Sequence, residues 1–430
     1  MHSPDFIAPA GRVLTRGGAP FFWLADTCWS AFTNMTDAEW QDYLAKRAAQ
    51  GFNVVQVNAL PQWDRCGSTL GLYPFPTQDG LTFAYDGTLN AAYFARAGQM
   101  AALAAAHGIT LAVVVQWCNY VPGTWASAKH GENVLPAAMV EPVVKTICDT
   151  FYKYRPVFII SGDADFETPQ AVERYVWVTH LVEQYAPGAP LAYHLSGRND
   201  RLPPELAAHA ALYLYQSGHN PAYRSMARTL AQSFRARTPA RPVLNSEPCY
   251  EQMGYSQLAY GRHRREDCRC ALWTSLLCGA CAGITYGAHG VWNWYKPNMP
   301  ENPISGEGFL QAPVCTDALA LPGAEDFAFA RRLLEFWGNW DFAPCPALPA
   351  VYRDDIPAAQ CGTRTVLYLP TAAPLRLAGD HTAAHLYFID LENQDRLPAR
   401  CTYQNGQTCV EQAPCYRDAL LIIEQENMPC

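Results

Sequence analysis

One pattern recurs eight times along the sequence: a short apolar run, then a longer stretch whose apolar residues recur at helical spacing. Continuous apolar runs are typical of parallel strands in a sheet that helices cover on both faces. The predicted strands are residues 21–25, 52–60, 109–117, 157–161, 190–194, 212–216, 242–246 and 282–286. Eight such units predict an α/β fold closed into a (β/α)8 barrel, or TIM barrel.

An open doubly wound sheet is the competing fold. It usually carries a glycine-rich ligand-binding loop after its first strand, whereas residues 26–29 here read Asp-Thr-Cys-Trp. The predicted helices also begin with recognisable caps. Thr36 and Glu39 form a capping box at one helix start, and Asn90 can cap the next helix. The missing glycine-rich loop favours the barrel. The caps locate the starts of its first helices.

The sequence changes in character after about Gly338. Short strand candidates follow, separated by proline, glycine and asparagine. They are residues 351–353, 365–369, 385–389, 400–403 and 419–424. We therefore expect two domains, a barrel over residues 1–338 and a small all-β sandwich over residues 339–430.

Charge and hydropathy restrict the partners that the chain can have. Its formal net charge is −8 and no basic run is present, so nucleic acid is not an expected partner. The longest apolar run, residues 109–115, is far shorter than the ~20 residues of a membrane span. Residues 1–20 lack the pattern of a signal peptide, which predicts a cytoplasmic protein. The 16 cysteines then fit as small buried side chains in a reducing compartment, with a disulfide framework as the alternative.

Four cysteines lie close together in sequence and need separate consideration. Cys268, Cys270, Cys278 and Cys281 could suggest a zinc site. Strong zinc sites use paired cysteines on turns, whereas these four follow one helical stretch. We interpret them as buried helix residues, and we expect no metal or other cofactor.

Active sites of such barrels form at the carboxyl ends of the strands. Asp163 ends the fourth predicted strand and Glu247 directly follows the seventh. Glycoside hydrolysis needs two carboxyl groups that flank the scissile bond. Because strands four and seven lie on opposite sides of an eight-stranded barrel, this pair can face each other across its mouth. Asp165 and Glu251 are the alternatives at the same two positions.

Other polar and aromatic side chains at the strand ends are candidates for substrate binding. Tryptophan rings stack on the apolar faces of sugars, and amides and imidazoles bond to hydroxyl groups. The predicted substrate-binding residues are Asp26, Trp29, Gln56, Asn58, Trp117, His194, Gln216, His219, Tyr250, His289 and Trp292. Gln116 also stands at a strand end.

Two other functions are compatible with these strand ends. The first is a metal-dependent hydrolase that would use His194, His219 and His289, although the chain has no HxH or HExxH motif. The second is a carbohydrate-binding barrel without catalysis.

Several of these segments resemble the apiosidase-like barrel family, glycoside hydrolase family 140 and its relatives. The similar segments are residues 21–29, 43–56, 162–163, 216–219, 247–251 and 285–292. The resemblance implies a (β/α)8 barrel followed by a β-sandwich, and hydrolysis of apiose linkages in plant cell-wall pectin. It also implies that Asp163 is the acid/base and Glu247 the nucleophile of a retaining mechanism.

The chain differs from the family pattern in two places. Ser161 precedes Gly162-Asp163 where the family usually has a second glycine, and residues 61–83 diverge. Both differences bear on the specificity for apiose more than on the chemistry of hydrolysis. The sequence therefore predicts a glycoside hydrolase without a cofactor. It would remove a terminal sugar, apiose-like or another furanoside, from a plant-derived oligosaccharide or glycoside.

Overall fold

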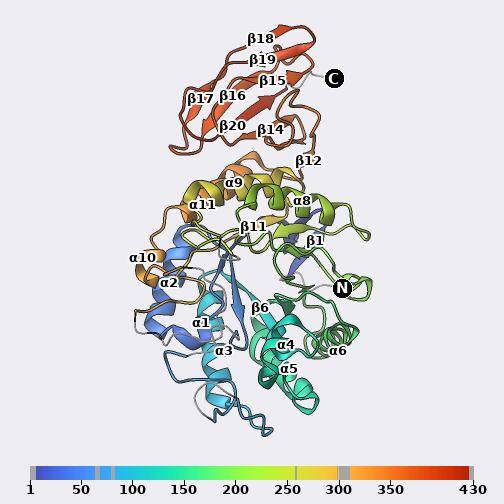
Figure 1. Ribbon diagram of the computed structural model, residues 1–430, viewed down its shortest axis with the longest axis vertical. Coiled ribbons are helices and arrows are strands. Elements are labelled where there is room, and N and C mark those ends of the chain that lie inside the picture. Colours follow the sequence, from blue (N-terminus) through green and yellow to red (C-terminus); the bar gives the residue numbers. More distant parts are fainter. Residues whose placement is uncertain are drawn as a thin grey trace.

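The computed structural model describes residues 6–62, 68–78, 83–256, 259–297, 299 and 310–425. Within the divergent segment 61–83, residues 63–67 and 79–82 lie outside the described residues. A barrel forms the larger part of the molecule and a β-rich domain sits at one end of it (Figure 1). No helix among the described residues is long and apolar enough to cross a membrane.

Eight parallel strands form the barrel. They are β4 (Trp23–Thr27), β5 (Val54–Asn58), β6 (Thr110–Trp117), β7 (Val157–Gly162), β8 (Leu191–Ala192), β9 (Tyr213–Tyr215), β10 (Val243–Asn245) and β11 (Gly283–Tyr286). Their order in the sheet is β8-β7-β6-β5-β4-β11-β10-β9. The Ala211 N–H donates to the Leu191 carbonyl (2.8 Å) and the Arg198 N–H to the Gln216 carbonyl (2.9 Å), so both ends of the β8–β9 seam are bridged. The predicted barrel is confirmed.

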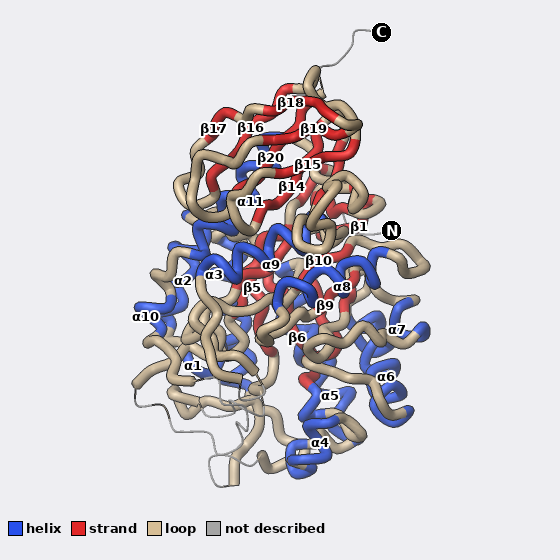
Figure 2. Tube along the Cα trace, turned by 45° about the horizontal axis from the view of Figure 1, so that its top comes forward, coloured by secondary structure: helices blue, strands red, loops and turns tan. Residues whose placement is uncertain are grey.

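Helices surround the strands (Figure 2). They are α1 (Ala31–Asn34), α2 (Asp37–Ala49), α3 (Ala91–Ala106), α4 (Trp125–Lys129), α5 (Ala137–Phe151), α6 (Pro169–Tyr185), α7 (Pro204–Ala207), α8 (Tyr223–Arg235), α9 (Arg265–Leu277), α10 (Cys315–Ala318) and α11 (Gly323–Trp337), with 3-10 turns η2 (Cys118–Tyr120), η3 (Gly131–Asn133) and η4 (Tyr152–Tyr154). Thr36 and Glu39 form the expected capping box, and Asn90 caps α3. A meander of β1 (Ile7–Ala10), β2 (Val13–Arg16) and β3 (Ala19–Phe21), which the sequence did not predict, leads into β4.

The C-terminal domain contains two antiparallel sheets. One has the order β12 (Ala343–Pro344), β13 (Ala358–Cys361), β14 (Arg364–Leu369), β20 (Ala419–Glu424), β16 (His385–Asp390) and β17 (Arg396–Pro398), and the other β15 (Leu375–Ala378), β19 (Gln407–Val410) and β18 (Cys401–Gln404). The sandwich is confirmed, but the strand predicted at 351–353 is wrong. Val351 and Tyr352 are exposed, and Tyr352 has a left-handed φ of 57° in a turn. The domain boundary at 338/339 falls between α11 and β12 and stays a prediction.

The larger sheet of the sandwich is buried on both faces. Successive strand side chains point to opposite faces. Val366 and Ile422 belong to the core that extends into the barrel, whereas Leu367 and Ile423 pack in the core between the two sheets. The helix α9 contacts this sheet, which explains why ten of its thirteen residues are buried.

This packing also accounts for the four clustered cysteines. Cys268 lies beside Cys249 (Sγ–Sγ 4.0 Å), whereas Cys270 lies beside Thr274 and Cys281 beside Asp341. The thiols therefore face different neighbours, which argues against a shared zinc ion. The cysteines in the described residues are free thiols and most are buried.

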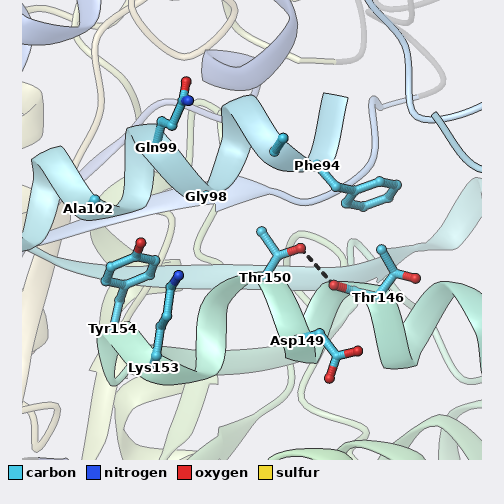
Figure 3. Close-up of a pocket in the computed structure, with 10 residues that line it drawn as sticks. Phe94, Gly98, Gln99, Ala102, Thr146, Asp149, Thr150, Lys153 and Tyr154 are labelled. Atoms are coloured by element: carbon cyan, nitrogen blue, oxygen red, sulfur yellow. Dashed lines mark hydrogen bonds between the residues drawn. The ribbon is translucent and has the colours of Figure 1, made fainter. Parts of the chain in front are cut away.

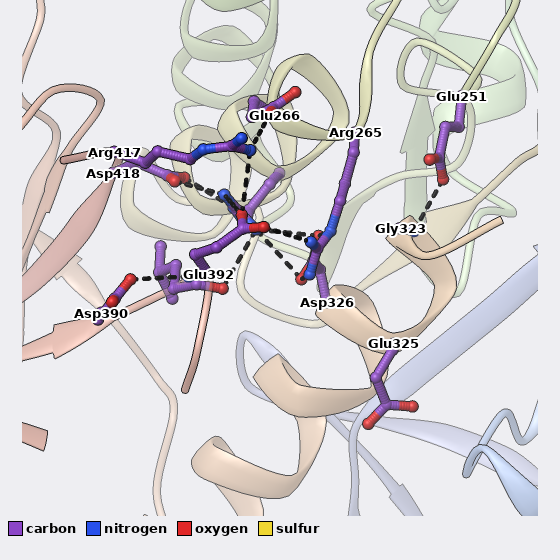
Figure 4. A network of polar contacts seen from close by, with 12 residues as sticks. Glu251, Arg265, Glu266, Gly323, Glu325, Asp326, Asp390, Glu392, Arg417 and Asp418 are labelled. Atoms are coloured by element: carbon purple, nitrogen blue, oxygen red, sulfur yellow. Dashed lines mark hydrogen bonds and ion pairs between the residues drawn. The ribbon is translucent and has the colours of Figure 1, made fainter. Parts of the chain in front are cut away.

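An ion-pair network joins the barrel to the sandwich (Figure 4). Arg269 of α9 is 1% exposed and binds both carboxylate oxygens of Asp418, at 2.8 and 2.5 Å. Arg265 binds both oxygens of Asp326 at 2.8 and 2.7 Å and reaches Glu392 at 2.9 Å. Because Asp418 and Glu392 belong to the sandwich, these contacts fix it against the barrel.

A groove of about 390 Å³ lies on the outside of the barrel between α3 and α5 (Figure 3). Gln99, Thr146, Asp149 and Lys153 are among the residues that line it. It lies against the outer helices and not at the strand ends, so it is separate from the site described next.

Candidate active site

Glu247 lies just beyond the carboxyl end of β10, in a loop that hydrogen bonds fix to the neighbouring elements. The Asn245 side chain donates to the Ser217 and Ser275 hydroxyls at 2.9 and 3.1 Å. The Glu247 carbonyl accepts the Gly218 N–H at 3.1 Å. The loops after β9 and β10 are thereby bound together, and the Glu247 side chain is only 8% exposed.

Side chains that follow two neighbouring strands surround the Glu247 carboxylate. Gln216 Nε2 donates to Oε1 at 2.8 Å, and His219 Nε2 lies 2.9 Å from the same oxygen. His194 Nε2 lies 3.3 Å from Oε2, without the geometry of a hydrogen bond. Oε1 is thus held by two donors, whereas Oε2 is the less restrained oxygen.

The tautomer of His219 follows from its second contact. Its Nδ1 accepts the Tyr250 backbone N–H at 3.3 Å, so this nitrogen carries no proton. The ring proton that faces Glu247 is then on Nε2, and Nε2 donates to Glu247. His219 therefore holds Glu247 by donating a hydrogen bond.

These contacts determine the charge of Glu247. Burial alone would raise the pKa of the carboxyl, but His194 and His219 outweigh burial and lower it to about 2. Glu247 is therefore ionised at neutral pH. A buried, ionised carboxylate at a strand end is suited to act as a nucleophile.

Aromatic rings lie beside Glu247. The ring centroids of Trp29 and Trp117 are 5.3 Å apart, and both contact His194, at 5.5 and 5.8 Å. The Trp117 indole lies over Gly162, where a Cβ would come within 2.1 Å of the ring. Glycine before Asp163 is therefore required for this aromatic cluster to form.

Tyr250 is held in a similar way. Its ring lies against Gly287, where a Cβ would come within 2.1 Å, and its centroid is 4.5 Å from that of His219. Burial and the charge of Glu247 raise the pKa of Tyr250 well above its usual range. The phenol therefore stays protonated and can donate a hydrogen bond near Glu247.

Three buried amides lie at or just beyond the carboxyl ends of the neighbouring strands β5 and β6. Both polar atoms of Asn58, Gln116 and Asn119 lack a partner among the described protein groups, although these residues are at most 3% exposed. Buried polar groups are nearly always bonded, so such a cluster calls for an explanation. Asn119, which lies on η2, was not predicted, because no strand pattern extends to it. Gln56, in contrast, donates to Thr27 (3.2 Å) and to the Ser246 carbonyl (2.9 Å) inside the barrel.

Asp163 directly follows β7 and is partly buried. Its backbone has a left-handed φ of 52°, and its carbonyl accepts the Trp125 indole N–H at 2.9 Å. Such a φ is uncommon for a residue other than glycine and often occurs at functional sites. Asp165, the alternative, accepts a weak bond from the Glu167 N–H at 3.4 Å, and burial raises the pKa of its carboxyl.

For three of the predicted residues, the contacts described are with groups other than Glu247. Asp26 is fully buried and pairs with Arg47 (2.6 Å) and Tyr43 (2.9 Å) of α2. The His289 ring lies beside the Gln252 carbonyl, at 3.3 Å. The Trp292 carbonyl accepts the Ser30 N–H. Asp26 therefore stabilises the contact of β4 with α2 and is not placed to bind a substrate.

Glu251, the alternative to Glu247, makes contacts that stabilise the fold. Its Oε2 accepts the Tyr286 hydroxyl at 2.7 Å and the Gly323 N–H at 2.8 Å, which ties the loop after β10 to the start of α11. Burial raises the pKa of Glu251, in contrast to that of Glu247.

The metal-hydrolase alternative requires that three histidines converge. His194 and His219 both face Glu247, whereas His289 faces Gln252. Among the described residues, the group with the spacing of metal ligands is His180, Glu183 and His209, which lies elsewhere. His194 and His219 therefore contact Glu247, and the three histidines do not share one ligand position.

A barrel of eight parallel strands, with an ionised carboxylate, indole rings and buried amides at its carboxyl ends, defines the class of barrel glycoside hydrolases. The chain belongs to the apiosidase-like family, because the model of the apiosidase-like catalytic domain matches residues 8–340. It is a glycoside hydrolase.

Solved structures with the same fold are also glycoside hydrolases. One described as a glycoside hydrolase is 18% identical, with a TM-score of 0.78 over 99% of this chain and 98% of that chain. A family 5 glycoside hydrolase from Bacteroides vulgatus is 19% identical, with a TM-score of 0.78 over 98% and 94% of the two chains. A family 5 mannosidase from Rhizomucor miehei is 12% identical, with a TM-score of 0.52 over 79% and 100%. A search of curated proteins found no match.

Proposed function

We propose that the protein is a retaining glycoside hydrolase in which Glu247 is the nucleophile and Asp163 the acid/base. The observation that carries this proposal is the Glu247 carboxylate, held ionised in a buried site by His194 and His219. Two donors occupy Oε1, so Oε2 is the oxygen that attacks the anomeric carbon.

The reaction then has two steps. In the first, Asp163 donates a proton to the leaving oxygen while Glu247 Oε2 bonds to the anomeric carbon and the glycosidic bond breaks. In the second, Asp163 accepts a proton from water, the water oxygen bonds to the anomeric carbon, and Glu247 is released. Two displacements retain the anomeric configuration, and no cofactor is required.

The amide cluster supports a neutral sugar as the substrate. Asn58, Gln116 and Asn119 offer donors and acceptors without charge, which suits hydroxyl groups and not a carboxylate. Trp29 and Trp117 add an aromatic surface that can contact the apolar face of the ring. We infer that the enzyme removes a terminal apiose or a similar neutral furanoside from a plant-derived oligosaccharide or glycoside.

The role of Asp163 is tested with leaving groups of different acidity. A nitrophenol leaves without protonation, whereas a sugar alcohol does not. In Asp163→Asn, hydrolysis of the sugar-linked substrate should fall by about 10²–10⁴-fold, and that of the nitrophenyl glycoside much less. Asp165→Asn is the matched control. If Asp165→Asn shows this selective loss and Asp163→Asn does not, the acid/base has been assigned to the wrong aspartate.

A further inference from the structure

Three metal-binding side chains converge on the outer surface of the barrel. His180 and Glu183 are three residues apart on α6 and therefore lie on the same face of the helix. His209 approaches from the turn after α7. His209 Nδ1 lies 2.6 Å from Glu183 Oε1, and His180 Nδ1 lies 3.2 Å from Glu183 Oε2. One ligand atom from each residue lies within 4.8 Å of the other two.

This arrangement suits a borderline divalent cation. Zinc binds imidazole nitrogen and carboxylate oxygen at about 2.0–2.2 Å, so its ligand atoms lie roughly 3.4 Å apart in a tetrahedral site. The two separations given above, 2.6 and 3.2 Å, are somewhat shorter than that value, and the side chains are 58%, 42% and 27% exposed for His180, Glu183 and His209. Small side-chain rotations can therefore bring all three onto one ion. We propose that His180, Glu183 and His209 bind one zinc-like divalent cation, with water completing its coordination.

The position of this cluster gives the ion a structural role. The helix α6 leads into β8, and His209 stands two residues before Ala211, whose N–H bonds to the Leu191 carbonyl of β8. The ion would therefore link α6 to the segment that enters β9, across the seam where β8 and β9 are not paired as strands. Because this is where the two strands begin, it lies at the opposite end of the barrel from Glu247. Binding should stabilise the barrel without changing hydrolysis.

The direct test is a calorimetric titration of the full chain with Zn²⁺ alone. The expected result is one site that His180→Ala and His209→Ala each weaken by at least about tenfold. His107→Ala, which removes a partly buried histidine at the end of α3, should leave the site unchanged. All three positions are at least partly exposed, and circular dichroism checks that each variant folds. No binding, or equal binding by the parent and both site variants, would overturn the proposal.

A thermal measurement tests the role of the ion. Saturating Zn²⁺ should raise the Tm of the parent and of His107→Ala by a few degrees, because a ligand that binds only the folded state stabilises it. It should leave the Tm of His209→Ala unchanged. Binding without a rise in the Tm of the parent would overturn the link across the seam.

Discussion

Two buried carboxylate sites in this molecule are stabilised by different partners. At the junction with the sandwich, Asp418 is held by both nitrogens of an Arg269 fork and by the Tyr368 hydroxyl. At the mouth of the barrel, Glu247 is held by an amide and two imidazoles. Arginine occupies both oxygens of a carboxylate, whereas the donors around Glu247 leave Oε2 without a well-formed hydrogen bond from the described residues.

The difference indicates what makes one buried carboxylate stabilise the fold and leaves another able to react. A bidentate arginine adds geometric restraint and leaves little room for a reacting atom. Amide and imidazole donors that bind one oxygen keep the carboxylate ionised and leave the other oxygen for chemistry. Asp26 also pairs with an arginine, Arg47, although through a single oxygen. We assign it to the scaffold because Arg47 and Tyr43 hold that oxygen against α2.

The largest expected effect is the loss of the Glu247 charge. Glu247→Gln keeps the shape of the side chain and removes the nucleophile, so kcat should fall by about 10⁴-fold or more. Steady-state kinetics measure this loss, and the thermal midpoint checks the fold. Glu251→Gln is the matched control and should affect stability more than turnover. Near-normal turnover by Glu247→Gln would remove the distinction between the two carboxylate sites.

The next effect should appear in stability alone. Arg269→Met leaves Asp418 buried without its charged partner, which should lower the free energy of unfolding by about 3–5 kcal/mol. The turnover of the folded enzyme should stay unchanged. Arg417→Ala removes an arginine that is 52% exposed and pairs with Glu266, and this should cost less than about 1 kcal/mol. Chemical denaturation followed by fluorescence compares the two variants, and equal losses would contradict the structural role of Arg269.

A smaller effect concerns pH. The pKa of Glu247 is lowered to about 2, so its charge stabilises the fold above the usual carboxyl range and this contribution is lost as pH falls through about 2. His219→Ala removes one donor and should raise that pKa. The acidic limb of kcat/KM should then move to higher pH, and kcat should fall by about 10–100-fold.

His289→Ala is the control for this shift, because its ring lies beside the Gln252 carbonyl. Its pH profile should match that of the parent. An unchanged acidic limb in His219→Ala would mean that His219 does not set the charge of Glu247.

The smallest effect should come from the amides. Gln116→Ala removes two polar atoms that lack protein partners, so the fold should lose little. If Gln116 bonds to a sugar hydroxyl, kcat/KM should fall by about 10-fold, the value of one net hydrogen bond. Kinetics and thermal midpoints separate the two effects. A large loss of stability with unchanged kinetics would place Gln116 with the scaffold.

The sequence was sufficient to predict the barrel, because short apolar runs alternate with stretches of helical spacing eight times and the first long helices begin at recognisable caps. It also indicated the position of Glu247, since a carboxylate directly after a buried strand must lie at the mouth of the barrel. The direction of a side chain at a strand end is harder to predict. Asp26 ends a predicted strand as Asp163 does, but it faces Arg47 of α2, and a one-residue change of register would reverse that.

Long-range contacts account for the other differences. Nothing near Cys268 or Cys270 in sequence indicates that α9 is enclosed between the barrel and the sandwich. Residues 351–353 read as a strand, although the chain turns there at Tyr352. Asn119 lies on η2, beyond the end of β6, where no strand pattern extends.

The central claim, that Glu247 is the nucleophile, is tested most directly by trapping it. A fluorinated glycoside of the substrate sugar with a good leaving group should form a stable glycosyl-enzyme, because fluorine slows the second step. Mass spectrometry of the digested protein locates the sugar. The account predicts one sugar per chain, attached to Glu247 and absent in Glu247→Gln. A sugar attached to Asp163, Asp165 or Glu251 would contradict it.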